Sequence, residues 1–319
     1  MQIKKKKPDT NLLTSDLVFI GGLTRSGKSF LCPIISSLNN SETFICDSIA
    51  ENIYYANFLK KIDDDYAKFF LKLIYNEKIY NLRIGRNLNR RDADYSSITH
   101  SVIQKIYDKR EKSTKEGDDI INKIKKDKNF FPIMFHDVLL KPKLIFESFQ
   151  NSKIIFIERH PVELIYEWED KKYYGDFYSN PRNMTLSHKY NDKLYPYWCF
   201  DSEQEFSNLK NSFEKTIFLI EKLYTKQKKN FLSLNKKNKK NIMIIKYDAM
   251  VGTTNYKLKA ILSFLKTTKG KKTNYIIKKQ NGNRELNNEF KKKQREKILS
   301  CISLEYKKKL YKLEKIYEK

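Results

Sequence analysis

Long apolar runs are absent from this sequence of 319 residues. Near the basic N-terminus (Met1 to Thr10), the apolar run Leu17–Ile20 is too short for the core of a signal peptide or for a helix that crosses a bilayer. No other stretch approaches the length of a membrane span. We therefore expect a soluble intracellular protein, located in the cytoplasm and without a transmembrane segment.

Cysteine is also scarce. The four cysteines are Cys32, Cys46, Cys199 and Cys301, and no two of them form a C-x-x-C pair. This spacing is typical of reduced thiols in a cytosol and argues against a zinc site. The sequence gives no reason to expect a bound metal.

Arginine is rare among the basic residues, because only ten of the 64 Lys and Arg residues are Arg. Sequence-specific readers of nucleic acid rely on the two-pronged guanidinium of Arg, whereas this chain spreads Lys over its length. The formal charge of +26 therefore does not predict a dedicated nucleic-acid partner. It does favour fast association with a small anionic ligand.

Hydrophobic residues make up 40% of the chain, which is enough for a sizeable core. Apolar strand-like runs alternate with segments of helical periodicity, and there is no internal repeat. This alternation predicts a three-layer α/β fold with a mainly parallel central sheet flanked by helices. We expect one domain over residues 1–319, with a helical insertion at about 49–128 and a basic C-terminal helix at about 290–319.

The expected elements follow from the apolar patterning. Strands are predicted at 16–21, 43–46, 130–135, 153–157 and 241–246. Helices outside the insertion are predicted at 29–38, 144–149, 206–224 and 256–265. We expect a loop at 170–200, which is rich in Tyr, Asn and Pro, and a solvated connection at 226–240, which is rich in Lys and Asn.

The segment between the first strand and the first helix reads Gly22-Leu-Thr-Arg-Ser-Gly27-Lys28-Ser29, which fits the G-x-x-x-x-G-K-S spacing of a phosphate-binding loop. Glycines at these positions let backbone N–H groups turn toward phosphate oxygens, and the helix dipole adds to the attraction. Lys28 can reach a phosphate oxygen, and Ser29 can bind phosphate or magnesium. The loop therefore predicts a phosphorylated nucleotide as ligand, with either a phosphoryl or a sulfuryl group transferred.

A second candidate position follows the strand at 153–157. Arg159 stands just after this strand, and Pro161 begins a helix. The carboxyl ends of the strands face the ligand crevice in open α/β sheets, so Arg159 is expected to point into it. The alternative is a structural ion pair, for example with Glu163.

Three segments together resemble the sulfotransferases that use 3′-phosphoadenosine-5′-phosphosulfate. The loop R-S-G-K-S-F-L is similar to their R-S-G-T-T-x-L loop, and K-I-I-F-I-E-R-H-P-V-E-L is similar to their second motif, a strand leading to R-N-P-x-[DE]. Tyr247-Asp248-Ala-Met followed by Phe264-Leu265 resembles the family's Y-E-D-L followed by F-L. The three matches occur in the family's order and cover roughly residues 16–265.

The resemblance implies roles for these residues. It implies that Arg25, Ser26, Gly27, Lys28 and Ser29 hold the 5′-phosphosulfate of the donor. It also implies that Arg159 pairs with the 3′-phosphate and that magnesium is not required, since Lys28 and Arg25 neutralise the leaving phosphate.

His136, at the end of the strand at 130–135, resembles the His that removes the acceptor's proton in the cytosolic branch of the family. Imidazole suits this task because its ordinary pKa lies near neutrality. The alternative is a His whose hydrogen bonds are satisfied at a strand end. The acceptor is expected to be a hydroxyl or amine of a carbohydrate or small metabolite, and to be contacted by residues 81–94 and 170–200.

The chain departs from the family at two positions. Lys28 replaces the first Thr of G-T-T, and Glu167 stands where the family usually has a Ser that also binds the 3′-phosphate. Two other functions therefore remain open. One is a P-loop kinase or other nucleoside triphosphatase that uses Mg-ATP, with Asp137 organising the metal. The other is an inactive relative that binds a nucleotide or a sulfated glycan.

Overall fold

A computed structural model describes residues 8–175 and 179–318 of the chain. Residues 1–7 of the basic N-terminus, residues 176–178 of the Tyr-rich segment and Lys319 lie outside the described residues.

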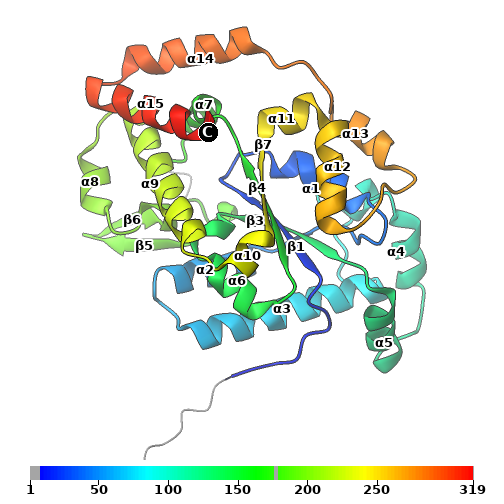
Figure 1. Ribbon diagram of the computed structural model, residues 1–319. Helices are drawn as coiled ribbons and strands as arrows, with labels where there is room; N and C mark the ends of the chain where they lie inside the picture. The colour runs from blue at the N-terminus through cyan, green and yellow to red at the C-terminus, as the bar shows by residue number, and fades with distance from the viewer. Residues whose placement is uncertain (1–7, 176–178, 319) are drawn as a thin grey trace, which may run out of the picture.

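The centre of the fold is a parallel sheet of five strands in the order β2-β3-β1-β4-β7 (Figure 1). The strands are β1 (Leu17–Gly22), β2 (Ile45–Cys46), β3 (Phe131–His136), β4 (Lys153–Glu158) and β7 (Ile242–Lys246). These are the five runs that the apolar pattern predicts as strands, with bounds that differ by one or two residues. The inner strands β3, β1 and β4 are largely buried on both faces, and such strands have continuous apolar runs that are visible in the sequence.

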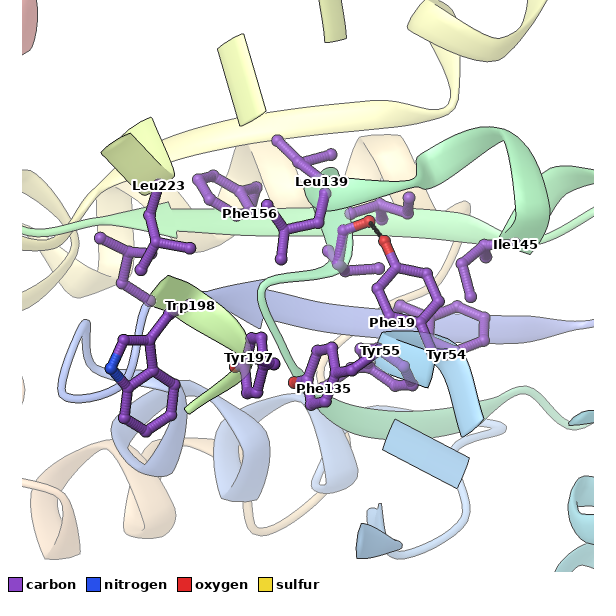
Figure 2. Packing of buried hydrophobic residues seen from close by; sticks show 14 of the residues in the cluster. Phe19, Tyr54, Tyr55, Phe135, Leu139, Ile145, Phe156, Tyr197, Trp198 and Leu223 are labelled. Carbon is purple, nitrogen blue, oxygen red and sulfur yellow. Dashed lines mark hydrogen bonds between the residues drawn. The ribbon is translucent and has the colours of Figure 1, made fainter. Parts of the chain in front are cut away.

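Alternate side chains of β1 enter two hydrophobic clusters on opposite faces of the sheet. Val18 and Ile20 pack with helices α1 (Lys28–Ser36), α12 (Thr254–Leu265) and α13 (Thr273–Lys279). Phe19 lies on the other face, beside Phe135 (Figure 2). The centre of its ring is 5.7 Å from that of Phe135 and 5.9 Å from that of Phe149. Helices thus cover both faces, and the predicted α/β class with a mainly parallel sheet is confirmed.

The larger cluster, on the Phe19 face, takes in side chains from most of the remaining helices. These helices are α2 (Ser48–Phe58), α3 (Asp64–Ile84), α5 (Asp118–Asp127), α6 (Pro142–Ser148), α7 (Pro161–Asp170), α8 (Glu203–Asn208), α9 (Ser212–Leu232), α14 (Asn288–Cys301) and α15 (Leu304–Glu318). Helix α11 (Tyr247–Gly252) belongs to the smaller cluster through Met250 and Val251, and the other helices are α4 (Gln104–Glu111) and α10 (Lys236–Lys240). Of the described residues, none belongs to a helix long and apolar enough to cross a membrane.

The expectation of a loop at 170–200 is wrong in its second half. Residues 187–196 form a hairpin of β5 (Ser187–Tyr190) and β6 (Lys193–Pro196), and Asn191 and Asp192 between them have φ angles of 45° and 58°. Two consecutive left-handed residues of this kind form the tight turn that suits the twist of a hairpin. Tyr197 and Trp198 then enter the core, where Figure 2 shows them.

Two further expectations are corrected. The predicted solvated connection at 226–240 is mostly helical, because α9 continues to Leu232 and α10 follows it. The predicted basic helix at about 290–319 is two helices, α14 and α15, which Figure 1 shows as neighbours in orange and red. Ile302 between them has an extended backbone and is buried, and this ends the first helix.

Candidate functional site

The phosphate-binding loop joins β1 to α1, at the carboxyl edge of the sheet. Gly22 has a φ angle of 147°, and a Cβ atom there would lie 2.3 Å from the Ser26 hydroxyl and 2.5 Å from the Ile157 carbonyl oxygen. Gly27 has a φ angle of 111°, and a Cβ atom there would lie 2.3 Å from the ring of Tyr247. Both glycines are therefore required by the backbone and by close neighbours.

The loop offers donors that the described residues leave unused. Gly27 caps the N-terminus of α1 without a side-chain hydrogen bond, and the first turn of that helix contains no acidic residue. The first N–H groups of a helix have no partner within the helix, and they attract anions. The hydroxyl oxygen of Ser26 is buried and has no hydrogen-bond partner among the described residues. Ser29, in contrast, is exposed.

Lys28 lies inside the loop with only 3% of its surface exposed. Its Nζ donates hydrogen bonds to the carbonyl oxygens of Gly22 at 2.9 Å and Leu23 at 2.7 Å. Burial lowers the pKa of Lys28 to about 8, although the carboxylates of Asp137 and Glu51 act in the opposite direction. The ammonium group therefore lies inside the loop, and these two carbonyl oxygens use two of its three N–H donors.

His136 stands in register with Gly22, because β3 and β1 are adjacent parallel strands. Its Nδ1 lies 3.0 and 3.1 Å from the two carboxylate oxygens of Glu51, and Glu51 also accepts a hydrogen bond from the His136 backbone N–H at 2.7 Å. If Nδ1 carries the proton, the carboxylate holds the ring so that Nε2 is left as the acceptor. The side chain of His136 is 30% exposed, so a substrate can reach it.

Glu51 is a residue that the sequence reasoning missed. It lies in the first turn of α2, where Ser48-Ile-Ala-Glu51 looks like a helix-capping pattern. The actual N-cap is Asp47, whose side chain accepts from the Ala50 N–H, and Glu51 is free to bind His136. A carboxylate 85 residues before its histidine leaves no local signal in the sequence.

Arg159 follows β4, and its guanidinium lies beside the phosphate-binding loop. Nη1 donates to the Arg25 carbonyl oxygen at 2.9 Å, and the guanidinium carbon lies 5.2 Å from the centre of the Tyr247 ring. The ion pair with Glu163, considered above as the alternative role of Arg159, is present only as a long contact of 4.0 Å, whereas Glu167 lies at 3.7 Å. The Nε atom of Arg159 is buried and has no partner among the described residues.

The structure thus brings together three segments that are far apart in the sequence. These are the loop at 22–29, Arg159 after β4, and Tyr247 after β7, which all meet at the carboxyl edge of the sheet. Trp168 in α7 fastens the arrangement by donating a hydrogen bond from Nε1 to the Thr24 carbonyl oxygen at 2.8 Å. The arrangement can hold a ligand with more than one anionic group, beside an imidazole able to accept a proton.

Asp137, the candidate magnesium ligand, follows His136 but is only 1% exposed. One of its carboxylate oxygens accepts from the Tyr197 hydroxyl at 2.5 Å, and the other accepts from the Gln227 amide at 3.2 Å. Burial raises the pKa of Asp137. Among residues 8–175 and 179–318, no group of three or more His, Cys, Asp or Glu residues could hold a metal ion.

No protein-family model and no curated protein sequence matches this chain. Solved structures with a similar course of the chain include several sulfotransferases. The sulfotransferase domain of the Synechococcus olefin synthase has 13% identity and a TM-score of 0.47, with 98% of each chain covered. A sulfotransferase domain from the curacin biosynthetic pathway has 13% identity and a TM-score of 0.44, with 82% of this chain and 77% of that chain covered. A sulfotransferase from Mycobacterium avium has 9% identity and a TM-score of 0.40, with 92% and 78% covered.

Proposed function

We propose that this protein is a sulfotransferase that moves the sulfuryl group of 3′-phosphoadenosine-5′-phosphosulfate to a hydroxyl or amine of a carbohydrate or small metabolite. The observation that carries the proposal is the meeting of the phosphate-binding loop, Arg159 and Tyr247 at one edge of the sheet, with His136 in register with Gly22. The same three segments carry the sequence resemblance to sulfotransferases.

In this proposal, Arg25, Ser26, Gly27, Lys28 and Ser29 bind the 5′-phosphosulfate. The buried, unpaired hydroxyl of Ser26 and the ammonium of Lys28 are the groups best suited to phosphate oxygens. Arg159 binds the 3′-phosphate, for which its buried Nε remains without a partner in the described part of the chain.

The transfer itself forms a bond between the acceptor oxygen or nitrogen and sulfur, and breaks the bond between sulfur and the bridging oxygen of the 5′-phosphate. The electron pair of the broken bond stays on that oxygen, where Lys28 stabilises the added charge. His136 takes the acceptor's proton at Nε2, and Glu51 stabilises the imidazolium that results.

Residues 184–197 supply one candidate wall for the acceptor, because they pack on α2, the helix that carries Glu51. Asn52 binds the Met184 carbonyl at 2.8 Å and the Leu186 N–H at 3.1 Å, and Tyr55 stacks on Tyr197 with ring centres 3.7 Å apart. Tyr55 also donates a hydrogen bond to the His136 carbonyl oxygen at 3.1 Å.

The alternative of a magnesium-dependent kinase is less well supported, because the Asp137 carboxylate is buried and bound by Tyr197 and Gln227. A nucleotide-binding relative without turnover is the other alternative, and the pairing of Glu167 with Arg25 is the observation in its favour.

Thermal unfolding separates these functions. Adenosine 3′,5′-bisphosphate without magnesium should raise the melting temperature, and Lys28→Ala should abolish the rise. ATP should have little effect. Stabilisation by ATP that depends on magnesium, with no response to the bisphosphate, would contradict the sulfotransferase proposal, and a failure to sulfate any acceptor despite tight bisphosphate binding would favour the non-catalytic relative.

A further inference from the structure

A single carboxylate, that of Glu167, bridges the two arginines of the site. Its Oε2 lies 2.8 Å from Nε and 2.6 Å from Nη2 of Arg25, and its Oε1 lies 3.7 Å from Nη2 of Arg159. Arginine binds carboxylate and phosphate with the same two-pronged geometry. Glu167 therefore makes the contact that an anionic group of a ligand would make with both guanidinium groups.

The position of Glu167 is fixed by its neighbours. The next residue, Trp168, is anchored to the Thr24 carbonyl, and Arg159 is anchored to the Arg25 carbonyl. The bridging carboxylate consequently belongs to a helix that Trp168 holds against the loop, and Arg159, just before this helix, makes a second contact with the loop. The side chain of Glu167 is 27% exposed.

The charges around this contact are balanced. Glu163, one turn before Glu167 on α7, lies 3.8 Å from the ammonium of Lys291, and Lys291 lies 2.7 Å from Asp248. Burial and the Asp248 carboxylate raise the pKa of Glu163, as expected where negative groups gather. A phosphate dianion added to this balanced cluster would meet repulsion unless a carboxylate left it.

We propose that Glu167 is an internal counter-anion that determines nucleotide specificity. It occupies the arginine pair in the free protein. A nucleotide with both phosphates must displace it from both arginines, from Arg25 at the 5′-phosphate and from Arg159 at the 3′-phosphate, so the preference for a 3′-phosphorylated nucleotide over its 5′-monophosphate counterpart is weakened. This inference rests on the proposed function, since it concerns the second phosphate of the same donor. Glu167 is thus a specificity-determining residue.

The test compares two nucleotides by isothermal titration calorimetry on the full chain: adenosine 3′,5′-bisphosphate and adenosine 5′-phosphate. Glu167→Gln keeps the shape of the side chain and removes its charge. We expect it to raise affinity for the bisphosphate about tenfold, which corresponds to one charge-assisted hydrogen bond. Affinity for the monophosphate should rise at most about threefold, because that ligand competes with Glu167 only at Arg25, whereas the bisphosphate competes at Arg159 as well.

Glu169→Gln is the matched control. It removes a carboxylate from the same helix, but the Glu169 carboxylate accepts its hydrogen bond from the Ser212 hydroxyl, at 3.1 Å, instead of from an arginine. It should leave both affinities unchanged. Glu167→Ser provides a second variant, smaller and neutral, and should also increase the ratio of bisphosphate to monophosphate affinity if the glutamine variant folds poorly.

Three other outcomes contradict the inference in different ways. If both nucleotides bind and lose affinity in Lys28→Ala, but the affinity ratio is the same in wild type and Glu167→Gln, only the role of Glu167 is wrong. If Glu167→Gln raises the affinity for both nucleotides equally, the carboxylate acts through its negative charge on the whole site and does not select against the 3′-phosphate. If neither nucleotide binds to any variant, this inference and the proposed function both fail.

Discussion

Replacing Lys28 by methionine tests whether the buried ammonium group destabilises the folded protein and whether nucleotide binding requires it. Burial lowers the pKa of Lys28 from 10.5 to about 8, so its charge costs the folded state about 3 kcal/mol at pH 7, at about 1.4 kcal/mol per pH unit. Methionine fills a similar volume without charge but gives up the hydrogen bonds to the carbonyls of Gly22 and Leu23, worth about 1 kcal/mol each. We therefore expect Lys28→Met to stabilise the protein by about 1 kcal/mol at pH 7, while nucleotide binding is lost.

The sign of this difference should reverse with pH. Between about pH 8 and 10.5 the unfolded state still holds the lysine proton that the folded state has released, so the stability of the wild type rises with pH relative to the variant. The rise should amount to about 2 kcal/mol between pH 7 and 9.5, which makes the variant the less stable protein at the higher pH.

Urea denaturation followed by circular dichroism measures the free energy of unfolding of wild type and Lys28→Met at pH 7 and at pH 9.5. Lys292→Met, at an exposed position on α14, serves as the control and should show the same difference from wild type at each pH. A difference between wild type and Lys28→Met that does not change from pH 7 to 9.5 would refute the lowered pKa of Lys28.

Two further predictions concern catalysis and the fold. His136→Ala should lower kcat for sulfuryl transfer by about 10²- to 10⁴-fold with little change in donor affinity, and Glu51→Gln should lower it less; full activity in His136→Ala would exclude a proton-accepting role. Burial alone would raise the pKa of Glu42, but hydrogen bonds and charges from Arg110, Tyr107 and Arg83 lower it to about 2. The ionised Glu42 carboxylate therefore contributes about 3 kcal/mol to the free energy of unfolding above pH 4.5, and this contribution is lost as the pH falls toward 2. The stability difference between wild type and Glu42→Gln, measured by urea denaturation, should shrink over that range. A constant difference would contradict the lowered pKa.

The sequence predicts the sheet well because its three inner strands, β3, β1 and β4, are largely buried on both faces. Leu17–Gly22 and Phe131–His136 are apolar almost without interruption, and each is followed by a break in the pattern that marks the carboxyl edge. The phosphate-binding loop is equally visible, because its glycines are required at fixed spacing by the backbone itself. These features depend on neighbours in the sequence.

The features that the sequence did not predict depend on residues far apart in the chain. Glu167 meets Arg25 across 142 positions, and Glu51 meets His136 across 85. The hairpin at 187–196 was missed for a different reason, since its strands are short and polar and only the Asn191-Asp192 turn marks it. Pairing at long range is decided by the packing of whole helices and strands, which periodicity does not reveal.

The order of the strands has a consequence for the synthesis of the chain. β7 is the last strand of the sheet to be made, yet it pairs with β4 and is followed at once by Tyr247, which packs on Gly27. Until about 250 residues have left the ribosome, β4 keeps an open edge, and such edges pair readily with other chains. Until then the nascent chain lacks both β7, which pairs with β4, and Tyr247, which packs on the phosphate-binding loop. Its many lysines give it a high net charge, which opposes association with other chains at this stage.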